Sequence, residues 1–322
     1  MIIDEHVKSG PITKAQPLRS VKKHYKVYYY IAILSVLVVA ALVAILLILP
    51  QRFDDDSSSG DNSTQTHQRV VERPLFLFVG DSLTEQGIDP SVNGWITLLQ
   101  YQYSRSCDII TRGLSGYNTR WYLKYAMPII LEEIYSRAYT PTFITVWLGT
   151  NDHALANGSD PERHVPLDQY KTNLIRIIRG FQAFAPDSNF FLITPSHIDD
   201  SVREKYAADR SDEKRGLADR TNAMAREYAK ACVETAIYLD IPVFDLHTYF
   251  NVMSEATRNA FLIDGLHLNS KGNRIVSDQV IGMIESNFPE VSTRLQTLAY
   301  PPSKTCVEED PWIPDPADAA SG

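Results

Sequence analysis

The chain has 322 residues, of which 44% are hydrophobic and 22% charged, and its formal net charge is −8 at pH 7. This composition excludes wholesale disorder, a collagen-like fibre and a disulfide-rich scaffold, and the length suits one large domain or two small ones. The acidic balance argues against a nucleic-acid partner, because neutralising phosphates requires clustered Lys and Arg.

The first predicted element is a membrane-spanning helix. Val27–Leu49 has 23 residues without a single charge, which as a helix would measure roughly 35 Å. That length crosses a hydrocarbon core of about 30 Å with modest tilt. Tyr28, Tyr29 and Tyr30 suit the headgroup region at one end. We therefore expect a signal-anchor helix over residues 27–50, which would make the membrane a partner of this chain.

The flanking charges predict the orientation of this helix. Residues 1–26 form a basic leader with six Lys or Arg and two acidic residues, a net charge of +4. The positive-inside rule keeps such a leader in the cytoplasm. The chain is thus expected to be a single-pass type II membrane protein whose remaining residues are lumenal, in an endomembrane compartment such as the ER or Golgi, or extracellular. The sequons at Asn62 and Asn157 are then possible N-glycosylation sites.

After a polar stalk over residues 51–72, apolar runs of strand length alternate with amphipathic helical stretches. The expected strands are Leu75–Val79, Asp108–Thr111, Phe143–Leu148, Phe190–Ile193 and Pro242–Phe244, and the expected helices are Trp95–Tyr103, Thr119–Arg137, Leu167–Phe184, Asp212–Tyr238 and Lys271–Phe288. Continuous apolar strands between helices are typical of a parallel sheet covered on both faces. The pattern predicts an α/β fold, a three-layer flavodoxin-like sandwich with a five-stranded parallel sheet, over residues 73–290. Residues 291–322 read as a Pro-rich, acidic tail, either wrapped on the surface or disordered.

Chemically useful residues follow three of the predicted strands. Ser82 follows the first strand, Gly113 the second and Asn151 the third. Ligands of open α/β sheets bind at the carboxyl ends of the strands, so these residues are expected to share one edge. Ser82 could be a nucleophile or merely a helix cap. Gly113 could admit a ligand to the backbone or be a turn glycine, and Asn151 could donate from its amide or only form a turn.

A late Asp–His pair supplies a candidate base. Asp264 and His267 are three residues apart just before the last predicted helix. The carboxylate can accept a hydrogen bond from one imidazole nitrogen and leave the other free, which is how a weak hydroxyl nucleophile is activated. Surface capping or half a metal site would give the same pattern. No matching Cys, His or carboxylate set lies nearby in the sequence, so a zinc site is not expected. The pairing of Cys107, Cys232 and Cys306 is left open, although Cys107 fits a small buried residue.

Taken together, these segments resemble the SGNH, or GDSL-type, esterase and lipase superfamily. The resemblance rests on Gly80-Asp81-Ser82-Leu83, Gly113, Gly149-Thr150-Asn151-Asp152 and Asp264-Gly265-Leu266-His267, in that order, and covers about residues 74–288. The run from Arg112 to Trp121 is similar to the isoamyl acetate-hydrolysing esterase-like branch. The resemblance implies a Ser82–His267–Asp264 triad, an oxyanion hole made by the backbone N–H groups of Ser82 and Gly113 with the Asn151 amide, and no cofactor or metal.

The expected function is that of a membrane-anchored carboxylesterase acting on short acyl or acetyl esters. A lysophospholipase or lipase and a carbohydrate O-acetylesterase are alternatives within the enzyme class, so the substrate could be a small molecule, a lipid or an acetylated glycan. A catalytically silent ectodomain that binds a glycan or lipid is the alternative of another class. The sequence leaves the oligomeric state open.

Overall fold

The computed structural model describes residues 73–311, which belong to one compact unit. The predicted leader, anchor and stalk, the sequon at Asn62 and the last eleven residues of the predicted tail lie outside this range. Within residues 73–311, no helix combines the length and the apolar character needed to cross a membrane.

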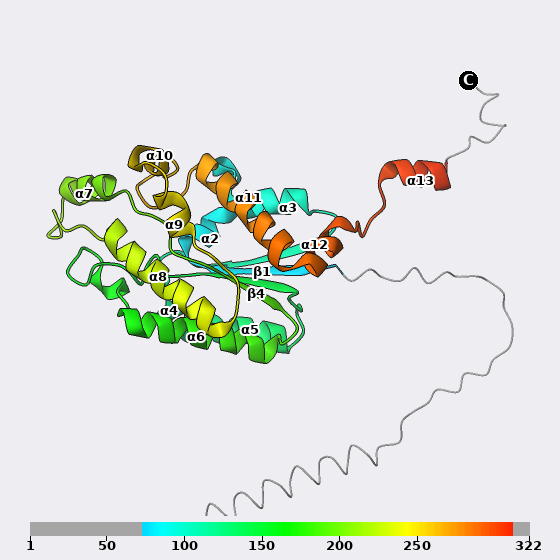
Figure 1. The fold of residues 1–322 in the computed structure, drawn as a ribbon, viewed down its shortest axis with the longest axis horizontal. Helices are drawn as coiled ribbons and strands as arrows, with labels where there is room; N and C mark the ends of the chain where they lie inside the picture. The colour runs from blue at the N-terminus through cyan, green and yellow to red at the C-terminus, as the bar shows by residue number, and fades with distance from the viewer. Residues whose placement is uncertain (1–72, 312–322) are drawn as a thin grey trace, which may run out of the picture. The chain divides into compact units, whose positions relative to one another are not determined.

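Five parallel strands form the centre of the fold, in the order β2-β1-β3-β4-β5. The strands are β1 (Leu75–Gly80), β2 (Asp108–Gly113), β3 (Phe143–Trp147), β4 (Asn189–Ile193) and β5 (Val243–Phe244). Strand β1 pairs with β2 from Leu75 opposite Asp108 to Gly80 opposite Gly113. On its other side β1 pairs with β3, starting with Phe76 opposite Phe143. The predicted three-layer architecture with a five-stranded parallel sheet is confirmed, since helices cover both faces of this sheet (Figure 1).

The helices are α2 (Ser82–Glu85), α3 (Trp95–Gln102), α4 (Thr119–Trp121), α5 (Met127–Tyr135), α6 (Leu167–Phe184), α7 (Asp200–Asp209), α8 (Asn222–Leu239), α9 (Leu246–Asn251), α10 (Glu255–Asn259), α11 (Ser270–Asn287), α12 (Pro289–Gln296) and α13 (Ser303–Glu309). Short 3-10 turns occur at Gln86–Ile88, Pro90–Val92 and Pro161–Arg163, and a π-helical turn at Tyr122–Ala126 joins α4 to α5.

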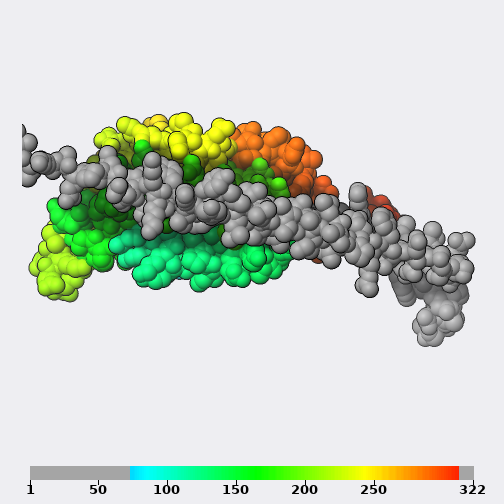
Figure 2. Space-filling view, turned by 90° about the horizontal axis from the view of Figure 1, so that it is seen from below, coloured from blue at the N-terminus to red at the C-terminus, as the bar shows by residue number. Residues whose placement is uncertain are grey.

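The two faces of the sheet are built from alternate residues of the same strands. Leu77 and Val79 of β1 point into the core covered by α5, α6 and α8. Phe76 and Phe78 point to the other side, against α3 and α11. Successive side chains of a strand point to opposite faces of the sheet. A strand therefore presents apolar side chains to both faces only when its apolar residues follow one another without interruption, as they do here. The space-filling view shows the residues near 230 (yellow) and 280 (orange) along one edge and the blue-green residues near 125 along the opposite edge (Figure 2).

The structure differs from the sequence expectation beyond residue 290. The described part of the predicted tail contains two helices, α12 and α13. Val291 and Leu295 of α12 are buried in the core beside α11, because these two apolar residues lie one helical turn apart and share a face. The core therefore extends to about residue 295.

All three cysteines carry free thiols. Cys107 is buried, as expected for a small apolar residue at the start of a strand, and burial raises the pKa of its thiol to about 12. Cys232 is buried in the core against the sheet, and Cys306 is exposed on α13. The two buried thiols therefore act as small hydrophobic groups and not as nucleophiles.

Candidate active site

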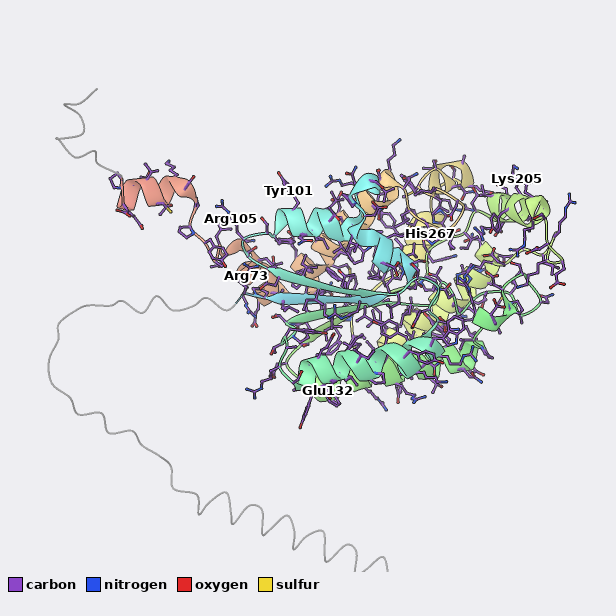
Figure 3. The ribbon with its side chains drawn as sticks, turned by 180° about the vertical axis from the view of Figure 1, so that it is seen from behind. Arg73, Tyr101, Arg105, Glu132, Lys205 and His267 are labelled. Carbon is purple, nitrogen blue, oxygen red and sulfur yellow. The ribbon has the colours of Figure 1, made fainter. Side chains whose placement is uncertain are left out.

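The predicted site residues gather at the carboxyl end of the parallel sheet. Arg73 precedes β1 and marks the amino end, whereas His267 lies at the far end of the strands (Figure 3). A cavity of 240 Å³ at that end is lined by Ser82, Gln86, Ser115, Gly116, Asn151, Arg163, Arg220, Leu266 and His267. Ligands of open α/β sheets bind at this edge, so the cavity is the candidate substrate site.

The β1–α2 corner places the Ser82 side chain. Asp81 and not Ser82 is the N-cap of α2, and its carboxylate accepts from the Leu83 backbone N–H at 3.0 Å. Ser82 therefore does not cap the helix, which was the alternative role that its position allowed. Its side chain is nearly buried, at 7% exposure, yet it lines the cavity.

Ser82, His267 and Asp264 form a continuous hydrogen-bonded chain. Nε2 of His267 lies 3.0 Å from Oγ of Ser82, and Nδ1 lies 2.8 Å from Oδ2 of Asp264. The other carboxylate oxygen of Asp264 accepts from the backbone N–H groups of Leu266 and His267, at 3.0 and 2.8 Å. The carboxylate thus holds both the imidazole ring and the loop that carries it, which leaves Nε2 directed at the hydroxyl.

Asp264 is stabilised as a carboxylate. Burial by itself would raise its pKa, but the hydrogen bonds from the His267 ring and from the His267 and Leu266 backbone outweigh burial. The pKa of Asp264 therefore lies well below its ordinary value. An ionised carboxylate at this position favours the tautomer of His267 that carries its proton on Nδ1 and offers Nε2 as an acceptor.

Asn151 is positioned at the same cavity by the loop after β3. It is 2% exposed, and its Nδ2 donates to the carbonyl of Tyr117 at 2.9 Å. A primary amide carries two hydrogens, and this bond uses one of them. The second hydrogen remains to donate toward a ligand in the cavity that Asn151 lines.

Gly113 is close to the site for a different reason than the sequence suggested. A Cβ atom at Gly113 would lie 2.2 Å from the backbone N of Glu85 and 2.6 Å from the carbonyl carbon of Thr84. Glycine is thus required by the close packing of α2 on β2, and Gly113 is not among the residues that line the cavity. The backbone N–H of Leu114 donates to the carbonyl of Gly80 at the end of β1, so by alternation the Gly113 N–H faces away from β1.

The sequence is similar to a known family of proteins. A model of the GDSL-like lipase/acylhydrolase family matches residues 78–275. The chain belongs to this family. A GDSL esterase/lipase of Arabidopsis thaliana is 36% identical over 66% of this chain and 85% of its own length. The human isoamyl acetate-hydrolyzing esterase 1 homolog is 32% identical over 66% of this chain and 82% of its own.

Solved structures share the fold of this GDSL-type hydrolase. A lipase/acylhydrolase from Enterococcus faecalis aligns with a TM-score of 0.50 at 20% identity, over 66% of this chain and 96% of its own. An acetyl xylan esterase aligns with a TM-score of 0.50 at 19% identity, over 65% of this chain and 99% of its own. Family membership makes the chain an ester-bond hydrolase.

Two arginines of the site could not be foreseen from the sequence. Arg163 and Arg220 line the cavity beside Asn151. Neither belongs to one of the recognised sequence blocks: Arg163 ends the 3-10 turn Pro161–Arg163, and Arg220 lies just before α8, 12 and 69 residues from Asn151. In the sequence Arg220 follows Asp219 and precedes Thr221, and an adjacent pair of opposite charges is not specific to a functional site.

The residues after Asn151 are buried beneath the site. The ring of His153 is fully buried, and neither ring nitrogen has a hydrogen-bond partner within residues 73–311. Burial and, secondarily, the charge of Arg220 lower the pKa of His153 to about 3. The ring is therefore neutral and packs near Tyr228 at 6.0 Å between centroids.

Two buried carboxyl groups next to the site, those of Asp152 and Asp81, accept hydrogen bonds from neighbouring helices. Asp152 accepts hydrogen bonds from the backbone N–H and the hydroxyl of Thr119, but burial dominates and raises its pKa to about 7. Burial likewise raises the pKa of Asp81 to about 6. Because the pKa of each carboxyl in the folded protein lies above its ordinary value of 3.8, the protonation of both residues is linked to folding.

Proposed function

We propose that this hydrolase is a serine esterase in which Ser82 is the nucleophile, His267 the general base and Asp264 the residue that orients the base. The hydrogen-bonded chain from Ser82 through His267 to Asp264 carries this proposal. Ser82 Oγ attacks the ester carbonyl while His267 Nε2 takes its proton, and His267 then protonates the departing alcohol. Water, deprotonated by His267, attacks the acyl–Ser82 ester, releases the acid and restores the hydroxyl.

The oxyanion of each tetrahedral intermediate is stabilised by two donors in this proposal. They are the backbone N–H of Ser82 and the second amide hydrogen of Asn151, and the position of both residues on one cavity supports them. The backbone N–H of Gly113, the third donor expected from the sequence, is not part of the proposal, because Gly113 does not line that cavity. Removing one such donor typically lowers kcat by about 10²–10³-fold. The kcat of Asn151→Ala is therefore expected to be lower than that of wild type by about this factor.

The substrate is proposed to be a short-chain ester. The cavity measures 240 Å³ and its lining is mixed, with two arginines, two serines and Asn151 against Leu266. The similarity to a relative whose name is isoamyl acetate-hydrolyzing esterase points the same way. A series of p-nitrophenyl esters from about C2 to C16 tests this directly. Maximal kcat/KM at the short end supports it, whereas a maximum above about C10 favours the lipase or lysophospholipase alternative.

Labelling with a fluorophosphonate tests the catalytic assignment. The wild type is expected to be labelled and Ser82→Ala to be unlabelled and inactive, with Ser286→Ala, an exposed serine on α11, as the matched control. Equal labelling of Ser82→Ala would refute the assignment. A folded wild type that neither reacts nor hydrolyses any ester would favour the silent binding domain.

We also propose that the catalytic domain is anchored by residues 27–50 in type II orientation. The basic leader and the uncharged span support this, and Asn157 is exposed in a turn where a glycan could be attached. Expression in a secretory host tests it: a mobility shift on glycosidase treatment that is absent in Asn62→Gln/Asn157→Gln is expected. Degradation of the catalytic domain by protease added outside intact microsomes would show that the domain faces the cytoplasm and would contradict the type II orientation.

A further inference from the structure

Two guanidinium groups fix the orientation of the Asn151 amide. Its Oδ1 accepts from Nη2 of Arg220 at 2.8 Å and from Nη1 of Arg163 at 3.3 Å. Guanidinium groups only donate, so the oxygen must face both arginines. The reverse orientation would set the amide NH₂ against two cationic donors and leave the Tyr117 carbonyl facing an oxygen. The arginines therefore determine which face of Asn151 carries the N–H groups.

Arg220 is itself held rigidly in the protein interior. It is 2% exposed, and its Nε donates to the carbonyl of Thr150 at 2.7 Å, so it binds both the backbone before Asn151 and the Asn151 side chain. Its Nη1 pairs with Asp219. A guanidinium fork held at three points has little freedom to reorient, which makes it a fixed reference for the amide.

The same ion network reaches the other half of the site. Asp219 also accepts two hydrogen bonds from Arg203, at 2.9 Å from Nε and 2.7 Å from Nη2. Nη1 of Arg203 then donates to the backbone carbonyl of Asp264 at 3.3 Å. Arg203 and Asp219 are both buried. A buried chain of charged groups thus runs from the Asn151 amide to the loop that carries Asp264 and His267.

We propose that Arg220 and Arg163 are positioning residues that hold and polarise the Asn151 amide as an oxyanion donor. This inference rests on the proposed function, because it requires Asn151 to act on the oxyanion. Two positive charges on Oδ1 draw electron density from the amide and make its remaining N–H a stronger donor. They also remove the need to reorient Asn151 when charge develops on the substrate, which is the condition under which such donors are most effective.

A double-mutant cycle on the full-length protein tests the proposal. Arg220→Lys keeps the charge beside Asp219 but loses the planar fork. It is expected to lower kcat on p-nitrophenyl acetate by about 10–100-fold, below the full cost of a lost donor, with KM changed by less than about twofold. In the Asn151→Ala background the same change should cost less than about twofold, because the group through which Arg220 acts is gone.

Arg226→Lys is the matched control, since Arg226 is an exposed arginine of α8 that pairs with Glu227; it should leave kcat unchanged in both backgrounds. Arg163→Ala provides a second variant should Arg220→Lys not fold, because Arg163 is at the cavity and 36% exposed. It is expected to lower kcat about 3–10-fold, as befits the longer of two charged hydrogen bonds, and again to have no effect without Asn151.

Equal fold losses of kcat in the presence and absence of Asn151 would overturn the inference and leave the arginines a purely structural role. That result is distinct from failure of the proposed function, in which the wild type itself would show no Ser82-dependent fluorophosphonate labelling. Thermal unfolding of each variant separates loss of folded protein from loss of turnover.

Discussion

The Nε2 atom of His267 lies 3.0 Å from the Oγ atom of Ser82, although 185 residues separate the two in sequence. The β1–α2 corner fixes one side of this contact, since Asp81 caps the helix that Ser82 begins. A short loop fixes the other side, since Asp264 binds the ring and two backbone N–H groups of that loop. The contact therefore depends on the Asp264 carboxylate as much as on the two residues that meet.

Asp264→Asn is expected to lower kcat by about 10³-fold or more, because an amide NH₂ facing Nδ1 would favour the wrong tautomer of His267. KM should change little, since Asp264 lies outside the cavity lining. Steady-state kinetics on a short p-nitrophenyl ester provide the measurement. Asp278→Asn, an exposed residue of α11, is the control. Retention of more than about a tenth of the wild-type kcat would count against the assigned role.

Much of the fold was predictable because burial on both faces leaves a clear signal in the strands. Each of the five expected strands is present to within a residue or two, and α6 spans Leu167–Phe184 as expected. The expected helix from Asp212 begins instead at Asn222, where the Thr221 side chain accepts from the Met224 N–H. Charged residues between 212 and 217 suit an exposed helix or a turn equally well, so composition alone could not place that boundary.

The site was predictable where its residues belong to a recurring pattern and not elsewhere. Ser82, Asn151, Asp264 and His267 come together as expected. Arg163 and Arg220 were missed because their roles depend on distant contacts, across 12 and 69 residues to Asn151. The reason for Gly113 was also hidden, because the close approach of α2 to β2 is a matter of tertiary packing.

Gly113→Ala is expected to destabilise the domain, since the added Cβ would meet the backbone of Glu85 and not a side chain that can move. Overpacking of this kind costs about 1–3 kcal/mol, which corresponds to a fall in Tm of roughly 2–12 °C for a domain of this size. Gly282→Ala is the matched control. A Cβ there meets nothing within 4 Å, and alanine favours the helix. A Tm of Gly113→Ala equal to that of wild type would contradict the packing argument.

His153→Phe is expected to make the domain less sensitive to acid. The folded-state pKa of His153 is about 3, below its ordinary value of 6.5, so the folded protein resists protonation there. The resulting stability is complete above pH 6.5 and is lost as pH falls toward 3. Phenylalanine removes this loss and gives up no hydrogen bond of the ring. Tm measured by scanning calorimetry should fall less between pH 7 and 4.5 in the variant; an equal fall in both proteins would contradict the prediction.

Asp152→Asn is expected to gain stability relative to wild type as pH rises, because the pH dependence contributed by Asp152 is opposite in sign to that of His153. The folded-state pKa of Asp152 is about 7, above the ordinary 3.8, chiefly because the carboxyl is buried. Its contribution to stability is complete below pH 3.8 and declines as pH rises toward 7, because ionisation then favours the unfolded chain. Asparagine cannot ionise, yet it keeps a side-chain oxygen that can accept from Thr119, which donates to both carboxylate oxygens in the native protein.

The difference in Tm between Asp152→Asn and wild type should therefore increase in favour of the variant from pH 4.5 to 7.5. Asp89→Asn is the matched control: hydrogen bonds from Ser91 lower the pKa of Asp89, so this carboxylate stays ionised in that range and its variant should show a flat difference. A flat or decreasing difference for Asp152→Asn would mean that the Thr119 hydrogen bonds outweigh burial. The Asp152 carboxylate would then be ionised in the native protein at neutral pH.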